Sequence, residues 1–215
     1  APLATQTVLV EDFVPERMDA TLTLPDAPIA LGDTPPLTVD ARYLFGAPAG
    51  NVAVEGEVRL VPLTTLDGFP SFRFGRHDDV GSARTKYLES GRTDANGRAV
   101  MALDIPKAEG AHALYEAQVA VRVIEGSGRP IERRLTRALQ PDGPVLGIKP
   151  LFDGVVDEGS DAAFELVAVG ADAPLEATWV MNRVTTRYQW YQLYGNWNWE
   201  PIVTRSEVAS GNVTL

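Results

Sequence analysis

Apolar and polar residues alternate with a period close to two along most of this sequence, which is typical of β-strands that are buried on one face. Between residues 52 and 60, for example, valine and leucine side chains alternate with Glu55, Glu57 and Arg59. Residues 37–45 and 115–123 follow the same pattern. The apolar faces of the three segments are Val52, Val54, Val58 and Leu60; Leu37, Val39, Ala41, Tyr43 and Phe45; and Tyr115, Ala117, Val119, Val121 and Val123.

No segment sustains the 3.6-residue spacing of an amphipathic helix, although residues 83–90 are compatible with one or two helical turns. Clusters of glycine, proline, aspartate and asparagine separate the short alternating segments. Short strands interrupted in this way are typical of antiparallel β-sandwiches. We therefore predict an all-β chain built from tandem antiparallel β-sandwich domains.

The run Gln140-Pro141-Asp142-Gly143-Pro144 predicts a domain boundary, because proline lacks the N–H group that strand pairing needs. We expect one sandwich over residues 1–139, with an insertion at about 64–92, and a second sandwich over residues 140–215. A seven-stranded sandwich typically contains about 100 residues. The second domain is therefore expected to be truncated at its C-terminal end.

The chain has 19 basic and 29 acidic residues, which gives a net charge of −10. Phosphate backbones require a clustered basic face, and the densest basic run, residues 129–137, is better explained as a solvated strand with its turn. We predict no nucleic-acid partner. No apolar run approaches the roughly 20 residues that span a bilayer, and residues 1–9 lack the basic start of a signal peptide. We expect no membrane insertion by this segment, which we interpret as an excised piece or a mature fragment.

The candidate chemistry of the sequence is sparse, and the absence of cysteine removes disulfides, thiolate metal sites and cysteine nucleophiles. His77-Asp78-Asp79 combines possible metal ligands, but His112 is the only other histidine, so a polar loop is the better interpretation. Asp94-Ala95-Asn96-Gly97 begins like a calcium loop yet lacks the closing glutamate, which favours a tight hairpin turn. A glycosidase pair of carboxylates would need a deep cleft. We predict no catalytic, cofactor-binding or metal-binding residue, and no enzyme activity.

Residues 188–199 concentrate aromatic side chains, including three of the four tryptophans. We predict a hairpin that turns at Gly195-Asn196. Alternation then places Trp197 and Trp199 on one face of their strand, and Tyr188 and Trp190 on one face of the partner strand. Exposed aromatic patches often mark contact sites. Because glutamine and asparagine fill the alternate positions, we favour a contact with another domain. The alternative is a carbohydrate- or protein-binding β-sandwich module that uses the hairpin of residues 188–199.

Six segments, taken in their order along the chain, resemble the bacterial branch of the alpha-2-macroglobulin family. The Phe-Arg-Phe-Gly pattern in the third segment carries most of the resemblance, whereas the turn and strand in the fourth occur in many sandwiches. The segments are VEDFVPERMDATL (10–22), LTVDARYLFGAPAGNVAVEGEVRL (37–60), GFPSFRFGRHDD (68–79), TDANGRAVMALDIP (93–106), GIKPLFDGVVDEGSDAAFELVAV (147–169) and RVTTRYQWYQLYGNWNWEPIVTRSEVASG (183–211).

The resemblance implies that the chain is an internal piece of a large protein that traps proteases and is built from a string of macroglobulin domains. Bacterial members are periplasmic and often lipid-anchored. No segment matches a bait region, and the Cys-Gly-Glu-Gln thioester of many members cannot lie in a chain without cysteine. The resemblance therefore implies a structural scaffold without a cofactor. Its implied partners are other domains of the same polypeptide and the proteases that the whole protein traps.

Overall fold

The structure is a computed structural model that describes residues 16–76, 81–108, 114–126 and 130–215. The regular elements within these ranges are all strands, which confirms the predicted all-β class. No helix in the described ranges is long and apolar enough to cross a membrane. The chain divides into two compact units, residues 1–145 and residues 146–215, and each is described by itself.

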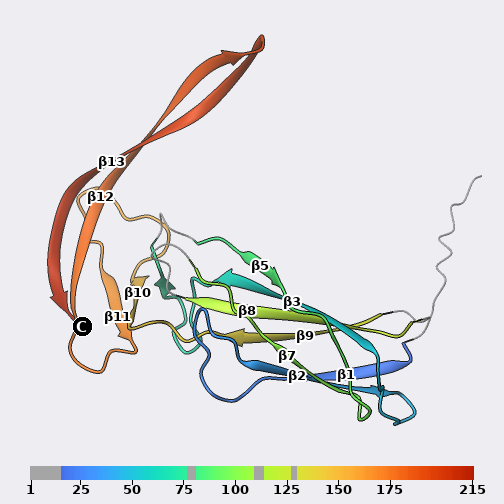
Figure 1. The fold of residues 1–215 in the computed structure, drawn as a ribbon. Coiled ribbons are helices and arrows are strands. Elements are labelled where there is room, and N and C mark those ends of the chain that lie inside the picture. Colours follow the sequence, from blue (N-terminus) through green and yellow to red (C-terminus); the bar gives the residue numbers. More distant parts are fainter. Residues whose placement is uncertain (1–15, 77–80, 109–113, 127–129) are drawn as a thin grey trace, which may run out of the picture. The chain divides into compact units, whose positions relative to one another are not determined.

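The strands of the first unit form two antiparallel sheets (Figure 1). One sheet has the order β1-β2-β7, and the other has the order β5-β3-β8-β9, with β6 also paired to β3. The short strand β4 belongs to neither sheet. The bounds are β1 Met18–Thr23, β2 Pro36–Tyr43, β3 Ala53–Pro62, β4 Arg73–Phe74, β5 Arg84–Tyr87, β6 Gly91–Arg92, β7 Arg98–Ala102, β8 Tyr115–Ile124 and β9 Ile131–Ala138.

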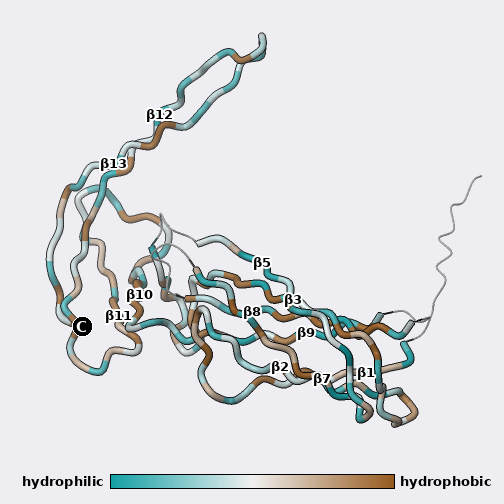
Figure 2. The backbone as a smooth tube through the Cα atoms, in the orientation of Figure 1, coloured by the Kyte–Doolittle hydropathy of each residue, from teal (hydrophilic) through white to brown (hydrophobic). Residues whose placement is uncertain are grey.

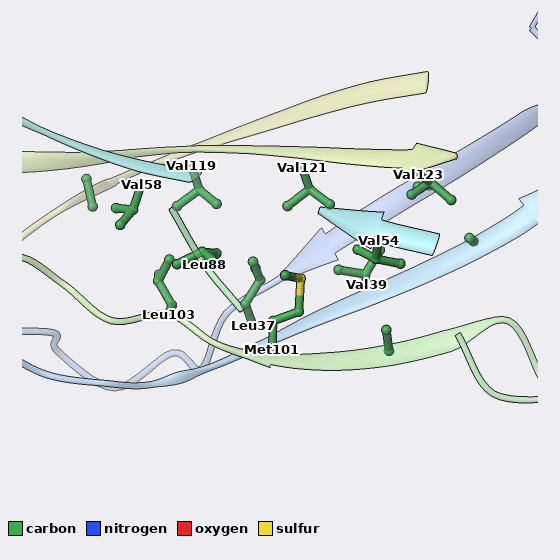
Figure 3. Packing of buried hydrophobic residues seen from close by; sticks show 14 of the residues in the cluster. Leu37, Val39, Val54, Val58, Leu88, Met101, Leu103, Val119, Val121 and Val123 are labelled. Carbon is green, nitrogen blue, oxygen red and sulfur yellow. The ribbon is translucent and has the colours of Figure 1, made fainter. Parts of the chain in front are cut away.

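The core of the first unit lies between the two sheets, as Figure 3 shows for side chains from both layers. Strand β8 contributes Tyr115, Ala117, Val119, Val121 and Val123, each at most 2% exposed. The alternate positions of β8 are partly or fully exposed and include Glu116, Gln118 and Arg122, as the sequence predicted. Antiparallel pairing brings the apolar residues of β3 and β8 opposite one another on the same face. The predicted antiparallel sandwich is confirmed, and its core is complete within this unit.

The predicted tight turn at Asp94–Gly97 is confirmed, but it joins β6 to β7, which pair with β3 and β2 in different sheets, so these two strands form no hairpin. The Asp94 carboxylate accepts hydrogen bonds from the backbone N–H groups of Asn96 and Arg98, at 2.8 and 2.9 Å. Gly97 has a φ of +81°, and a Cβ built on it would lie 2.2 Å from the backbone oxygen of Ala41. Glycine is therefore required here both for its backbone conformation and for the close approach to the neighbouring strand.

Two local expectations are wrong. Residues 83–90 form no helical turn: β5 pairs with β3, and Leu88 is buried against Gly56, where its side chain would lie 3.0 Å from an added Cβ. Phe45 does not join the apolar face of β2, because that strand ends at Tyr43 and the following turn leaves Phe45 80% exposed. Tertiary pairing in the first case and an early strand end in the second overrode the local pattern.

The expected insertion at about 64–92 contains a phenylalanine cluster of its own. The ring centroids of Phe69, Phe72 and Phe74 lie 6.0–6.5 Å apart, and Phe74 is only 2% exposed. The backbone N–H of Phe74 donates to the carbonyl oxygen of Thr64 at 2.9 Å. The Phe-Arg-Phe-Gly pattern thus forms a packed element, while β5 and β6, in the same range, extend the sheet of β3.

The second unit contains two short strands and one long two-stranded ribbon. Strands β10 (Val145–Pro150) and β11 (Phe164–Val169) are neighbours in a sheet, whereas β12 (Glu176–Leu193) and β13 (Asn196–Thr214) pair only with each other. Figure 1 shows β10 and β11 beside one end of the ribbon, whose other end extends beyond them. Residues 146–215, all of which are described, bury a single apolar side chain, Ala177.

Candidate functional site

The four aromatic residues singled out in the sequence lie on one face of the β12–β13 ribbon. Trp190 pairs directly with Trp199, and the rings of Tyr188 and Trp199 meet edge to face with centroids 5.3 Å apart and an interplanar angle of 73°. Trp197 lies opposite Gln192. Cross-strand partners share a face of an antiparallel ribbon. The structure therefore brings together residues that the sequence assigned to two separate strand faces.

The turn of the ribbon differs from the predicted position by one residue. It lies at Tyr194-Gly195, with φ values of +51° and +81°, between the paired residues Leu193 and Asn196. Positive φ at both central residues is the signature of a type I′ turn, whose twist matches that of the two strands. Moving the turn by one residue shifts the register by two, so each side chain keeps the face that alternation predicts.

The aromatic residues are part of a longer apolar stripe, which we call the aromatic face. Its members are each at least 51% exposed. Figure 2 colours the ribbon by residue hydropathy and shows short brown stretches between white and teal ones. Pro201, opposite Tyr188, lies on the same face. The opposite face is mainly polar, with Arg183, Arg187 and Glu200. The aromatic face consists of Val184, Tyr188, Trp190, Trp197, Trp199 and Val203.

A β-bulge divides the ribbon into a base, residues 176–181 and 209–214, and a tip half, residues 182–207. Met181 pairs with Ala209 and Asn182 pairs with Glu207, so Val208 is the extra residue. In the base, the ring of Trp179 lies over Gly211, where an added Cβ would come within 3.0 Å of it. The bulge and the extension of the stripe to the two valines were not predicted from the sequence. The valines could have been found by continuing the same count of alternate positions.

A pocket of about 390 Å³ lies beside the base of the ribbon. Trp179 and Met181 line it together with Phe164 and Leu166 of β11. Phe164 also meets Phe152 edge to face, with ring centroids 5.4 Å apart. This pocket contains no titratable side chain, so it provides apolar packing and no acid–base chemistry.

The other candidate residues do not form a site in the described part of the chain. His77-Asp78-Asp79 and His112 lie outside the described residues. Within those residues, no group of three or more histidine, cysteine, aspartate or glutamate side chains could hold a metal ion. The basic run, described from residue 130 onward, forms the solvated strand β9, as predicted. Arg133 pairs there with Glu16 and Asp19, at 3.1 and 2.8 Å.

The carboxylates with altered pKa values all favour the charged form. The hydrogen bond from Arg133, aided by the backbone N–H of Ala20, lowers the pKa of Asp19. Hydrogen bonds from Arg134 and Arg122 lower that of Glu132. Backbone hydrogen bonds likewise lower that of Asp94. Carboxyl groups with lowered pKa values are suited to fixing loops and strands rather than to proton transfer near neutral pH.

An aromatic contact at the end of β2, between partly buried Tyr43 and exposed Phe45, was also missed. The ring of Phe45 stacks on that of Tyr43 with centroids 5.2 Å apart and an interplanar angle of 11°. The Tyr43 hydroxyl donates to Glu125 at 2.9 Å, and this bond raises the pKa of Tyr43. Sequence alternation assigned both rings to the core side of the strand; this is correct for Tyr43, which packs against the core, and wrong for Phe45.

Two known bacterial domain families match the chain in succession. Residues 16–141 match the model described as Bacterial Alpha-2-macroglobulin MG5 domain, and residues 147–215 match Bacterial macroglobulin domain 6. The alpha-2-macroglobulin of Escherichia coli (strain K12) is 30% identical over 208 residues, which cover 88% of this chain and 12% of that protein. That of Xylella fastidiosa (strain Temecula1) is 34% identical, over 90% of this chain and 12% of that protein.

Solved structures of bacterial alpha-2-macroglobulins are similar to this one. The cryo-EM structure of E. coli alpha-2-macroglobulin in its native conformation has a TM-score of 0.72 and 26% identity, over 95% of this chain and 14% of that one. Salmonella alpha-2-macroglobulin reacted with methylamine has a TM-score of 0.68 and 26% identity, over 95% and 15%. Trypsin-activated E. coli alpha-2-macroglobulin has a TM-score of 0.61 and 26% identity, over 96% and 15%. The chain thus spans about an eighth of the length of these curated relatives.

Proposed function

Because this chain belongs to the bacterial alpha-2-macroglobulin family, we propose that it serves as a structural scaffold in a broad-spectrum protease inhibitor that traps its target. The observation that carries the proposal is the succession of two matched domains, MG5 and then domain 6, in one chain. Structures of a relative activated by trypsin and by porcine elastase support proteases as partners of the whole polypeptide. The two domains meet, in this proposal, near the boundary predicted at residues 139–140.

The scaffold proposal assigns no catalysis to the chain. The core and the ion pairs of the first unit hold its strands in place. The pKa values of Asp19, Asp94 and Glu132 are lowered, which does not suit these carboxyl groups to proton transfer near neutral pH. The other partners are neighbouring domains of the same polypeptide, which the aromatic face would contact through Tyr188, Trp190, Trp197 and Trp199. We place the whole protein in the periplasm, anchored through a lipid, where it defends the bacterium against foreign proteases.

The whole polypeptide that contains this chain provides the test. After incubation with trypsin or elastase, the protease should still cleave a small peptide substrate but should no longer digest a large protein substrate, because a trapped protease excludes large molecules. The 215-residue chain alone should protect neither substrate. Undiminished digestion of the large substrate in the presence of the whole protein would contradict the proposal, as would protection by this chain alone.

A carbohydrate-binding platform is the second candidate function, and the gathering of four aromatic rings on one ribbon face favours it. Sugar rings stack on exposed aromatic faces. The test is a titration of the chain with a panel of oligosaccharides, read by tryptophan fluorescence. Saturable binding that is lost in Trp190→Ala or Trp199→Ala would establish the platform, and no binding across the panel would leave the scaffold proposal alone.

A further inference from the structure

The ribbon of β12 and β13 is apolar on opposite faces in its two halves. In the base, the apolar side chains of β12 other than Val180 have odd numbers, as in Ala177, Trp179 and Met181. In the tip half the apolar stripe has even numbers, as in Val184 and Tyr188, and only Tyr191 and Leu193 beside the turn have odd ones. Successive side chains of a strand point to opposite faces. The apolar side of β12 therefore changes face between Met181 and Val184.

The bulge allows β13 to follow this change. Apart from Ile202 and the bulged Val208, its apolar residues keep odd numbers in both halves, as in Trp199, Val203, Ala209 and Val213. A bulge adds one residue to one strand and so shifts its pairing by one. Odd-numbered residues of that strand lie opposite odd-numbered partners on one side of the bulge and opposite even-numbered partners on the other side. With Val208 inserted, the odd residues of β13 pair with odd residues in the base and with even residues in the tip half. The change of face is thus built into both strands.

The base face packs partly against its own unit, whereas the aromatic face does not. Ala177 is 9% exposed, and Trp179 and Met181, which are 42% and 46% exposed, line the pocket that they share with β11. The aromatic face points to the other side of the ribbon, and none of its six side chains is less than 51% exposed. A two-stranded hairpin alone is marginally stable in water and gains stability from a third strand or a packed layer. The tip half therefore lacks the layer that its base has.

We propose that another β-sandwich domain of the same polypeptide covers the aromatic face by packing the face of one of its sheets against it. The inference rests on the proposed function in placing this chain among other domains of one polypeptide. The chain covers 12% of the length of its curated relatives, so most of such a polypeptide lies in other segments. Bound in this way, the ribbon would be a strap, held at its base by one domain and at its tip by another.

The shape and chemistry of the aromatic face favour this occupant. From Val184 to Trp190 the stripe is about 20 Å long, at ~3.4 Å per residue, which suits a sheet packed face to face. No charged residue lies on that face between the pair Thr186–Val203 and the pair Gln192–Trp197, while Arg205, opposite Val184, and Glu207, opposite Asn182, lie at the end nearer the base. An apolar centre with a charged rim is the usual anatomy of a protein interface. The net charge of −10 disfavours a second copy or an anionic membrane.

Two adjacent threonines provide a matched test, because the chain has no cysteine of its own. Thr186 lies on the aromatic face opposite Val203, and Thr185 lies on the other face opposite Thr204. In the 215-residue chain, Thr186→Cys and Thr185→Cys should react with a maleimide at similar rates, measured by peptide mass spectrometry. In the whole polypeptide, Thr186→Cys should react at least about tenfold more slowly, and Thr185→Cys should be much less affected.

Each other outcome overturns the proposal. Equal, fast labelling of both cysteines in the whole polypeptide would show an uncovered face. Protection of Thr186→Cys in the chain alone, with a doubled mass by light scattering, would identify a second copy. Protection that requires phosphatidylglycerol vesicles or cellohexaose would identify a lipid or a sugar. If Thr186→Cys fails to fold by circular dichroism, Val184→Cys repeats the test with Arg183→Cys as its control.

The protease assay on the same preparations separates this inference from the proposed function. A whole polypeptide that traps proteases while Thr186→Cys labels freely would overturn the domain contact and leave the trap intact. A polypeptide in which Thr186→Cys is protected but no protease is trapped would overturn the proposed function and leave the domain contact intact.

Discussion

The sandwich of the first unit and the ribbon of the second are both built from alternating apolar and polar residues, yet they bury those residues to very different extents. In strand β8 every apolar residue on the inner face is at most 2% exposed. On the ribbon, the aromatic face leaves Trp190 and Trp199 64% and 56% exposed. The same sequence pattern therefore builds a complete core in one region and an uncovered face in the other.

The difference lies in the number of layers that each region contains. Strands β3 and β8 face a second sheet, and Leu37, Val39 and Met101 from that sheet close the core (Figure 3). The tip half of the ribbon has no second layer within its own unit. Alternation thus identifies which face of a strand is apolar. Whether that face is buried inside the unit or is available to a partner depends on whether the unit contains a second layer that packs against it.

The largest expected effect comes from removing a core side chain of the sandwich. Leu37→Ala should lower the free energy of unfolding of the first unit by roughly 3 kcal/mol, because it deletes methyl groups from a fully buried site. Leu193→Ala, at a position 51% exposed on the ribbon, should cost less than about 0.5 kcal/mol in the same chain. Urea unfolding followed by circular dichroism measures both, and equal losses would contradict the contrast.

The next effect concerns the turn that joins two strand segments of the sandwich. Gly97→Ala should destabilise the first unit by at least about 1–2 kcal/mol from its positive φ alone, with a further loss because the new Cβ would meet the Ala41 oxygen. Gly91→Ala is the matched control, since nothing lies within 4 Å of a Cβ there. Thermal unfolding of the two variants should separate them clearly. Similar midpoints would refute the role assigned to Gly97.

Within the ribbon, two tryptophans should differ according to the half in which they lie. Trp179→Ala should cost about 1–2 kcal/mol of local stability, because its ring packs over Gly211 and lines the pocket with β11. Trp190→Ala should cost less than about 0.5 kcal/mol in the isolated chain. Hydrogen exchange measures the loss in the half that carries each substitution, residues 176–181 for Trp179→Ala and residues 184–203 for Trp190→Ala. An equal or greater loss in Trp190→Ala would mean that the tip half is already packed.

The smallest effect concerns the charge of Asp94. Its pKa is lowered from 3.8 by hydrogen bonds from the backbone N–H groups of Arg98 and Asn96, so the stability it contributes is present above pH 3.8 and is lost as the pH falls through the lowered folded-state pKa. Asp94→Asn keeps an acceptor oxygen but removes this contribution. Melting temperatures between pH 2.5 and 7 should converge for the two proteins in acid. A constant difference across that range would rule out the ionised carboxylate as the cause.

Much of the sandwich could be predicted because alternation is a local property that survives in the fold. Val54, Val58 and Val119 are buried as their positions indicated. Prediction failed where the chain departs from a strand. Phe45 continues the alternation of β2, but the turn at Gly46, with a φ of +98°, takes it out of the sheet. Residues 84–87 pair with β3 across the chain, which no local signal indicates.

The candidate surface was predicted in part for a related reason. A turn placed one residue late still assigns Trp190 and Trp199 to their correct faces, because the resulting register error is even. The bulge at Val208 shifts the pairing of the two strands by one residue. The pattern of apolar residues along β13 does not indicate this shift. The apolar stripe could therefore be predicted from the sequence. The change of face between the base and the tip half could be recognised only from the strand pairing in the structure.

Hydrogen exchange compared between the 215-residue chain and the whole polypeptide tests most directly whether the ribbon depends on a facing layer. In both proteins, amides of β3 and β8 should exchange slowly. Amides of residues 184–203 should exchange quickly in the chain alone and at least about 100-fold more slowly in the whole polypeptide, because packing against another domain suppresses opening of the hairpin. Fast exchange of these amides in both proteins, or slow exchange in both, would contradict the account.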